Sequence, residues 1–295
     1  MDPSSWRNWT RKQSQGITPW IQAEHIARVA QTAEQAGLGA VWTFERLLRP
    51  AQARMLGMDQ PVPLPDSYAS VLDPLETLAY VAARTSTIRL GTSVVDALFH
   101  NPVVLAKRLA TLDRLSGGRA MIGLGQGWME QEFEAAGVPV KRRGAGFAEH
   151  VQAMQACWGP DPVSFSGRFY SIPEADIGPK PSPSGLTLLA GVGAPAAIER
   201  AAALGMGIVV VVFDWDQARQ AVEAYGKGPG PLVFQVNGPV TDRPLTDRAP
   251  LTGSPEQVAG DLVQARELGA DHVLWHPMET GADELVERLA EVVSS

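Results

Sequence analysis

The chain has 295 residues, of which 45% are hydrophobic and 19% are charged, and it carries a formal net charge of -7 at pH 7. This composition is typical of a folded globular protein, and its acidic balance argues against nucleic acid or an anionic membrane as main partner, since both require a basic surface. No apolar run approaches the ~20 residues of a membrane span, so we expect a cytoplasmic protein. A single cysteine, Cys157, excludes an internal disulfide and is expected to serve packing.

Alternating strands and helices are predicted along the chain. A first helix is expected over 18–36, with Thr18 as N-cap and Pro19 in the first turn. Short apolar runs then predict strands, and apolar residues at helical spacing predict helices. The predicted strands cover 40–44, 88–92, 120–123, 186–190, 208–212, 232–236 and 272–275, and the further helices cover 74–83, 102–115, 130–136, 147–158, 196–204, 217–225, 255–268 and 284–293.

Two long segments interrupt this alternation. A proline-rich loop covers residues 48–73, and an irregular insertion is expected over 161–183. Loops of this length inside a compact domain are usually lids or binding loops. We therefore expect these two segments to determine the substrate, although neither carries a motif specific to one chemistry.

The sustained alternation predicts an α/β fold, and we expect a single TIM (β/α)8-type barrel over residues 1–295. A dinucleotide-binding sheet would require G-x-G-x-x-G after the first strand and an acidic residue some 20 positions later, and no stretch satisfies this. Only seven strands can be counted from residue 40 onward. The first strand is therefore degenerate or missing, and residues 1–17 form an atypical N-terminal segment.

Two of the predicted strands end in glycine-rich turns that open helices. Glycines at such positions allow the backbone to approach a ligand and to direct free N–H groups at it, which is a common way to hold phosphate. The same turns also occur as simple tight connections, so the motif alone leaves both interpretations open. The candidate ligand-binding residues are Gly125, Gln126 and Gly127 in the first turn, and Gly191, Gly193, Ala194 and Ala196 in the second.

Several segments occur in the order and spacing of one known family. They include VWTFERLLRP at 41–50, VLDPLETLAYVAARTSTIRLGTSVVD at 71–96, HNPVVLAKRLATLDRLSGGRAMIGLGQGW at 100–128 and LTGSPEQV at 251–258. On these motifs the chain resembles the bacterial luciferase-like family, and in particular its deazaflavin (F420)-dependent oxidoreductases. The resemblance extends over about residues 20–290.

This resemblance implies a cofactor that lies across the face formed by the carboxyl ends of the strands. The cofactor is F420, or FMN as the alternative. Its ring would rest on a bulge with a non-prolyl cis peptide, here at Ser93–Val94, and its phosphate would be held by the two glycine turns. The implied chemistry is hydride transfer with a small organic substrate, or oxygen activation when the cofactor is a flavin. Members of the family are usually dimers, so we expect a homodimer.

The sequence departs from the family at positions expected to carry proton transfer. Members that dehydrogenate sugars or alcohols have a histidine and a glutamate where this chain has Arg46 and Gln126. Arg46 is expected either to bind an acidic substrate or a cofactor phosphate, or to form a buried ion pair with Glu45. His100 and His276 both lie at the expected active face and are candidate proton donors, although a role in loop or packing contacts is also open. No spaced cluster of His, Cys and carboxylate residues predicts a metal site.

These departures leave a second hypothesis open. The changed positions Arg46, Gln126 and Met206, together with the missing first strand, are also compatible with a barrel that has lost its cofactor. Such a protein would serve as a binding or scaffold protein, or as a cofactor-independent enzyme that uses the same pocket.

The missing strand requires its own explanation, because a barrel short of one strand has two unpaired edges. Three explanations are open: the sequence starts downstream of the native start, the N-terminal segment covers the gap, or a partner chain covers it. We favour a segment that lies across the gap, using the apolar residues Trp6, Trp9 and Ile17, with dimerisation as support.

Overall fold

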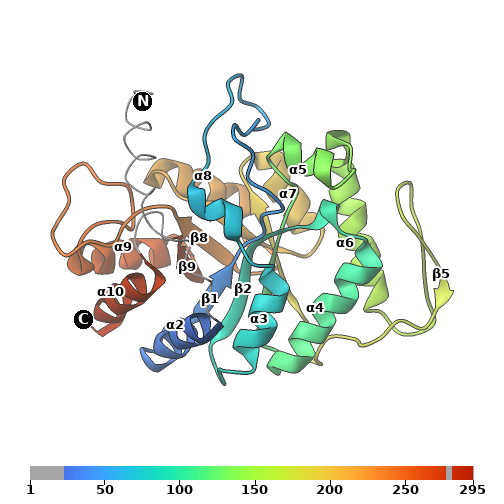
Figure 1. Ribbon diagram of the computed structural model, residues 1–295, viewed down its shortest axis with the longest axis horizontal. Coiled ribbons are helices and arrows are strands. Elements are labelled where there is room, and N and C mark those ends of the chain that lie inside the picture. Colours follow the sequence, from blue (N-terminus) through green and yellow to red (C-terminus); the bar gives the residue numbers. More distant parts are fainter. Residues whose placement is uncertain (1–22, 277–280, 295) are drawn as a thin grey trace.

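Seven parallel strands form a nearly closed barrel in the computed structural model, which describes residues 23–276 and 281–294 (Figure 1). Neighbouring strands pair in the order β1-β2-β3-β6-β7-β8-β9, so successive parallel strands lie side by side, and helices connect them on the outside. The strands are β1 (Ala40–Thr43), β2 (Arg89–Asp96), β3 (Ala120–Gly125), β6 (Thr187–Val192), β7 (Gly207–Val211), β8 (Leu232–Val236) and β9 (His272–Trp275).

The α-helices have the local signals that their sequences predict. Asp73 caps α3 by accepting hydrogen bonds from two backbone N–H groups of its first turn, and Asn101 does the same for α4. Gly117 ends α4 with φ 70°, a conformation that favours glycine. The helices are α2 (Ala23–Gln35), α3 (Pro74–Ala82), α4 (Pro102–Ser116), α5 (Glu130–Ala135), α6 (Ala145–Cys157), α7 (Pro195–Ala203), α8 (Trp215–Tyr225), α9 (Pro255–Glu267) and α10 (Ala282–Ser294).

Two apolar layers pack against the strands, one inside the barrel and one between the strands and the helices. Inside the strands, Trp42 packs with a cluster of five buried side chains, and a Cβ at Gly91 would overlap its indole, so the ring uses the space that this glycine leaves. Between strands and helices lies the main core, to which Cys157 belongs, as expected for a packing residue, and burial raises the pKa of its thiol. The inner cluster consists of Met121, Leu189, Val209, Val233 and Leu274.

The segment 161–183 is irregular only in part, at 176–183, so this prediction was partly wrong. It contains an antiparallel pair, β4 (Val163–Ser166) and β5 (Ser171–Ala175), which projects from the barrel (Figure 1). The Glu149 carboxylate on α6 accepts hydrogen bonds from the backbone N–H groups of Arg168, Phe169 and Tyr170, and so fixes the turn between the strands. This anchor comes from outside the segment, so the local pattern does not contain it.

The loop after β1 folds back over the start of α5. Backbone bridges join Ala53 to Val62 and Met55 to Met129, and the loop ends in a short 3-10 helix, η1 (Asp66–Ser70). Ala53 and Met129 are fully buried in a small apolar cluster between the loop and α5. The loop is therefore packed against the carboxyl face of the barrel.

The barrel has an opening between β1 and β9, which are the two end strands of the sheet order. Residues 1–17, which were expected to cover this gap, and the predicted start of the first helix at Thr18, lie outside the described residues. Within the described part of the chain, no helix has both the length and the hydrophobicity needed to cross a bilayer.

Candidate functional site

The carboxyl face of the barrel contains a distorted strand at the position predicted to receive a cofactor ring. The pairing of β2 with β3 shifts register between Thr92 and Val95, and the Ser93–Val94 peptide is cis, as predicted. A Cβ at Gly123 would overlap the Thr92 carbonyl oxygen, and Cβ atoms at Gly125 and Gly191 would lie 2.5 and 3.1 Å from Val94 methyl groups. These three glycines therefore make room for the bulge and for the Val94 side chain.

The first glycine turn is occupied by contacts within the chain. The Gly127 N–H donates to Asp96 Oδ1 at 2.9 Å, and a Cβ at this residue would lie 2.7 Å from the Phe133 ring. The Gln126 side chain accepts a hydrogen bond from the Gly144 N–H at 2.8 Å. In this conformation the Gly127 N–H already has an acceptor. This turn therefore has fewer free N–H donors for a phosphate than its sequence suggests.

The second glycine turn is open. Gly193 has no atom within 4 Å of the position that its Cβ would take, and both Gly193 and Ala194 are exposed. Ala194 precedes α7 with extended backbone and makes no side-chain capping hydrogen bond, and Pro195 and Ala196 begin the helix. The N-terminus of a nine-residue helix therefore faces this turn without a side-chain cap, which suits an anion.

Glu45 and His100 form a hydrogen-bonded pair next to the bulge. The Glu45 backbone N–H donates to the Val94 carbonyl at 3.0 Å, and its carboxylate accepts the Asp96 N–H at 2.8 Å. Its other carboxylate oxygen lies 2.7 Å from His100 Nε2. The His100 side chain is 17% exposed and its carbonyl lies 3.0 Å from His150 Nε2, so the ring is held but not sealed from solvent.

Arg46 lies in a buried charge cluster under the loop that follows β1. Its guanidinium lies 2.7 Å from Glu132 Oε2 and 3.8 Å from Asp96 Oδ2, and only 6% of the side chain is exposed. The group also stacks on the Trp128 ring, 4.6 Å from its centroid. An ion pair with Glu45 was one of the two interpretations of Arg46, and it was wrong, because Arg46 pairs with carboxylates that come from β2 and α5.

Burial shifts the pKa of two carboxyl groups in this cluster. Desolvation raises the pKa of Asp96 to about 6, against the opposing effects of Arg46 and the Gly127 N–H. Desolvation also raises the pKa of Glu132, again opposed by Arg46. This cluster therefore contains three carboxyl groups, counting Glu45, together with the Arg46 guanidinium and the His100 imidazole. Sequence reasoning missed both Asp96 and Glu132, although the position of Asp96 at the end of a strand was a usable signal.

His276 and a polar chain border the barrel mouth. The His276 ring packs on Phe44 with centroids 5.1 Å apart, and burial lowers the pKa of this imidazole. Within the described residues, its buried Nε2 has no hydrogen-bond partner. Ser93 Oγ lies 2.7 Å from Gln235 Oε1, and Gln235 Nε2 donates to Asn237 at 3.0 Å. Gln235 was also missed; it shares the strand face of inward-pointing Val233, two residues before it.

The chain is therefore a barrel of parallel strands and outer helices with a cis bulge and polar groups at its mouth. Comparison with protein families places residues 4–229 in the luciferase-like monooxygenase family, so the chain belongs to that family. The family contains both F420-dependent and flavin-dependent enzymes.

Curated relatives cover part of this chain. An uncharacterised protein of Mycobacterium tuberculosis is 35% identical over 179 residues, which are 60% of this chain and 61% of that protein. The F420-dependent glucose-6-phosphate dehydrogenase of Kineococcus radiotolerans is 31% identical over 188 residues, 62% of this chain and 51% of that enzyme. The matched stretch thus spans between half and about three fifths of the length of these relatives.

Solved structures share the fold over most of the chain. The monooxygenase RslO1 from Streptomyces bottropensis has a TM-score of 0.74 at 22% identity, and covers 92% of each chain. The coenzyme F420-dependent tetrahydromethanopterin reductase of Methanopyrus kandleri has a TM-score of 0.71 at 16% identity, over 92% of this chain and 95% of that one. A type II Baeyer-Villiger monooxygenase component of Pseudomonas putida, solved with FMN, has a TM-score of 0.68 at 15% identity, over 92% and 91%.

Proposed function

We propose that this protein is an F420-dependent oxidoreductase that acts on a small organic substrate, with FMN as the alternative cofactor. The observation that carries the proposal is the Ser93–Val94 bulge, which faces a surface of glycines on two other strands. The name of the Kineococcus radiotolerans relative supports F420 over FMN. The proposal includes the conversion of a substrate with the help of whichever of the two cofactors binds.

The residues present fit such a cofactor. A planar ring needs an apolar support with polar groups at its edge, and Val94 lies beside the Ser93 hydroxyl and the Gln235 amide. A phosphate needs N–H donors without competing acceptors, and the turn at Gly193 and Ala194 provides an open helix N-terminus. We therefore assign the phosphate to the second glycine turn and give the first turn a supporting role.

The bound cofactor would supply the hydride donor or acceptor. The chain itself would handle the proton, because His100 Nε2 and Glu45 Oε1 hold one between them at 2.7 Å and the ring is partly exposed. In this proposal Glu45 orients the imidazole of His100. Arg46 is enclosed by Glu132, Asp96 and Trp128, so it stabilises the carboxylates instead of binding substrate.

The proposal is tested by titrating the purified protein with F420 and with FMN and recording the fluorescence change. We expect micromolar binding of one of them. Gly193→Asp would place a carboxylate in the phosphate position and should weaken binding at least about a hundredfold. Gly260→Asp is the matched control, because Gly260 is also exposed with open space around it but lies on α9. Equal affinity in both folded variants would exclude the second turn.

One observation favours a second candidate function. The Gly127 N–H and the Gln126 amide are both engaged within the chain, as in a barrel that no longer holds a phosphate there. A protein that binds neither F420 nor FMN at high concentration would support a cofactor-free binding protein or cofactor-independent enzyme.

A further inference from the structure

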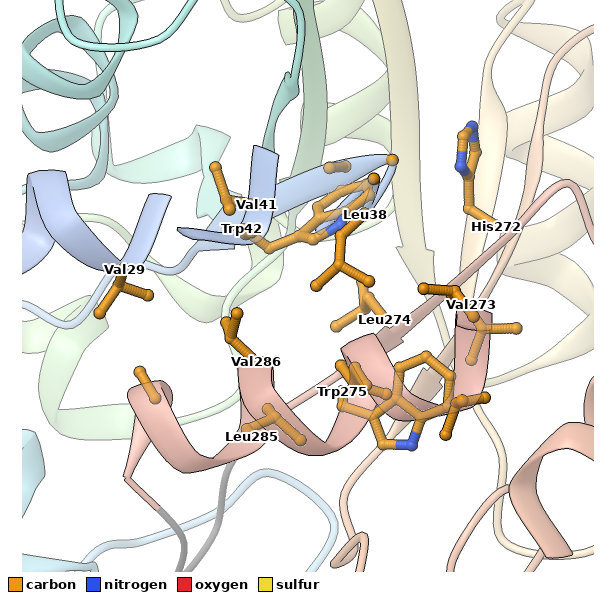
Figure 2. Close-up of a pocket in the computed structure, with 18 of the residues that line it drawn as sticks. Val29, Leu38, Val41, Trp42, His272, Val273, Leu274, Trp275, Leu285 and Val286 are labelled. Carbon is orange, nitrogen blue, oxygen red and sulfur yellow. The ribbon is translucent and has the colours of Figure 1, made fainter. Parts of the chain in front are cut away.

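A layer of inward-pointing residues forms the floor of the barrel mouth. Trp42 on β1 and Leu274 on β9, both labelled in Figure 2, pack with the inner cluster inside the barrel. Side chains two positions further along a strand point to the same side, so they make the next layer toward the carboxyl face. Six of the seven described strands contribute a partly exposed residue to this layer, at or just past the end of the strand. These floor residues are Phe44, Ser93, Gly191, Val211, Gln235 and His276.

The floor residues are accessible, unlike the layer beneath them. All six are partly exposed, whereas Met121, Leu189 and Val233 of the inner cluster are fully buried. Ser93 Oγ donates to Gln235 Oε1 at 2.7 Å although β2 and β8 are not neighbours in the sheet, so these two side chains meet across the barrel. A molecule that enters the mouth beside the Ser93–Val94 bulge therefore lies on this floor.

Among the described residues, the floor carries no charge. Three of its side chains are polar, and none of these is a carboxylate, an ammonium or a guanidinium. Burial lowers the pKa of the His276 imidazole from its usual 6.5, so the ring is neutral at pH 7. An anion on this floor would be partly desolvated without a counter-charge, which is costly. Three arginines on the loops that follow β1 and β8 are each paired with a carboxylate: Arg46 with Glu132, Arg49 with Asp66 and Arg248 with Asp261.

The floor also has few free hydrogen-bonding groups but a broad aromatic surface. The Gln235 amide accepts from the Ser93 hydroxyl and donates to Asn237, and His276 Nε2 is covered. The Phe44 ring lies 5.1 Å from the His276 ring and 5.6 Å from the Tyr68 ring, measured between centroids, and all three residues are partly exposed. A ligand that rests on these rings buries apolar surface, whereas a ligand with many hydroxyl groups loses hydrogen bonds to water without replacing them.

We propose that the substrate of this protein is an uncharged compound with a mainly apolar body that rests on the Phe44 and His276 rings, and that His276 determines this selectivity by keeping the floor uncharged. This inference rests on the proposed function, because it names the substrate class of the same site. The Kineococcus radiotolerans relative is named for glucose 6-phosphate, a phosphorylated sugar. The floor described above is unsuited to that class, because it lacks both a cation for the phosphate and free partners for the hydroxyl groups.

A pair of nearly isosteric probes tests the selectivity. Acetophenone and benzoate both carry a carbonyl group on a phenyl ring, and they differ in the charge of the carboxylate. We titrate each into the purified protein at pH 7 and measure the Kd by ligand-observed NMR, with glucose 6-phosphate as a third probe. We expect acetophenone to bind at least about tenfold more tightly than benzoate, and glucose 6-phosphate to be no better than benzoate.

Three variants locate the selectivity at His276. His276→Arg places a guanidinium on the floor and should shift the ratio of the two Kd values at least about tenfold toward benzoate. This change is a gain of benzoate binding, which a partly unfolded protein would not show. His276→Gln keeps the position uncharged and should keep the preference for acetophenone. The matched control is His272→Arg, the same exchange at the amino end of β9, away from the floor (Figure 2), and it should leave the ratio unchanged.

The contrary outcomes are distinct. Benzoate or glucose 6-phosphate that binds the wild type as tightly as acetophenone overturns the proposal, and so does an absence of acetophenone binding at tens of millimolar. An unchanged ratio in folded His276→Arg overturns the role of His276. If that variant does not fold, Gln235→Arg introduces the charge on the neighbouring strand of the same floor. The probes are titrated without cofactor, so a failure here is separate from a failure of the proposed function, which the F420 and FMN titrations detect.

Discussion

Replacing Asp96 by asparagine should change how the stability of this protein depends on pH. Burial raises the pKa of Asp96 from 3.8 to about 6, so the folded protein binds a proton at this site more tightly than the unfolded chain does. Between pH 4 and 6 the folded state therefore carries more protons, and its free energy of unfolding falls as pH rises. A difference of roughly two pKa units corresponds to about 3 kcal/mol, and this stabilisation is lost in full only at about one pH unit above the folded pKa of about 6.

Asp96→Asn removes this loss and keeps the geometry. The asparagine Oδ1 can still accept the Gly127 N–H, and Arg46 keeps its hydrogen bond to Glu132. We expect the free energy of unfolding of the variant, relative to the wild type, to rise by about 2.4 kcal/mol between pH 4 and pH 7. Urea unfolding at a series of pH values measures this difference. Glu132, whose pKa burial also raises, acts in the same direction in both proteins.

Asp161 provides a control of opposite sign. Its hydrogen bond from Lys180, 2.7 Å long, lowers its pKa, so its contribution to stability is present at neutral pH and is lost as pH falls through its folded pKa. Asp161→Asn should therefore be least favourable relative to the wild type at neutral pH. If the difference in unfolding free energy between Asp96→Asn and the wild type stays flat or falls from pH 4 to pH 7, the reasoning is refuted, because the effect of Arg46 would then outweigh burial and the pKa of Asp96 would not be raised.

Two further predictions compare matched pairs of variants, each by urea unfolding at pH 7. Glu132→Ala leaves Arg46 buried beside Asp96 alone and should cost about 3 to 5 kcal/mol, whereas Arg54→Ala, which breaks only exposed ion pairs, should cost far less. Similar losses would show that Arg46 is not buried as described. Gly125→Ala would place a methyl group against Val94 and Asp96 and should cost at least about 2 kcal/mol, but Gly193→Ala should change stability by less than about 0.5 kcal/mol. A tolerated Gly125→Ala would contradict the packing of the bulge.

Local sequence patterns predicted the seven strands well, because parallel strands are short apolar runs bounded by turns. The run at 232–236 matches β8 at both ends, and the first glycine turn follows β3 as expected. The cis bulge was predicted through the resemblance to the family and is present at Ser93–Val94. These features depend on residues close together in the chain, or on motifs that a family shares.

Long-range partners could not be predicted in the same way. Nothing near Gly127 shows that its N–H binds a carboxylate 31 residues earlier. Arg46 likewise finds Glu132 across 86 residues, because the loop after β1 folds over α5. In both cases the residue type suggested that the group binds a ligand, but in the fold the group bonds to a carboxylate of the same chain. Glycines near the bulge carry the same ambiguity, since Gly125 is required by Val94 whether or not a ligand binds.

The position of Trp42 has a kinetic consequence. Its indole fills the interior beside Gly91, among Met121 and the other side chains of the inner cluster, so the barrel is closed below its mouth. A cofactor and a substrate that share this mouth would both enter and leave through it. The molecule nearer the bulge at Val94 would then have to arrive first and leave last. Steady-state kinetics of such an enzyme should show ordered binding, in which the last product to leave competes with the first reactant to bind.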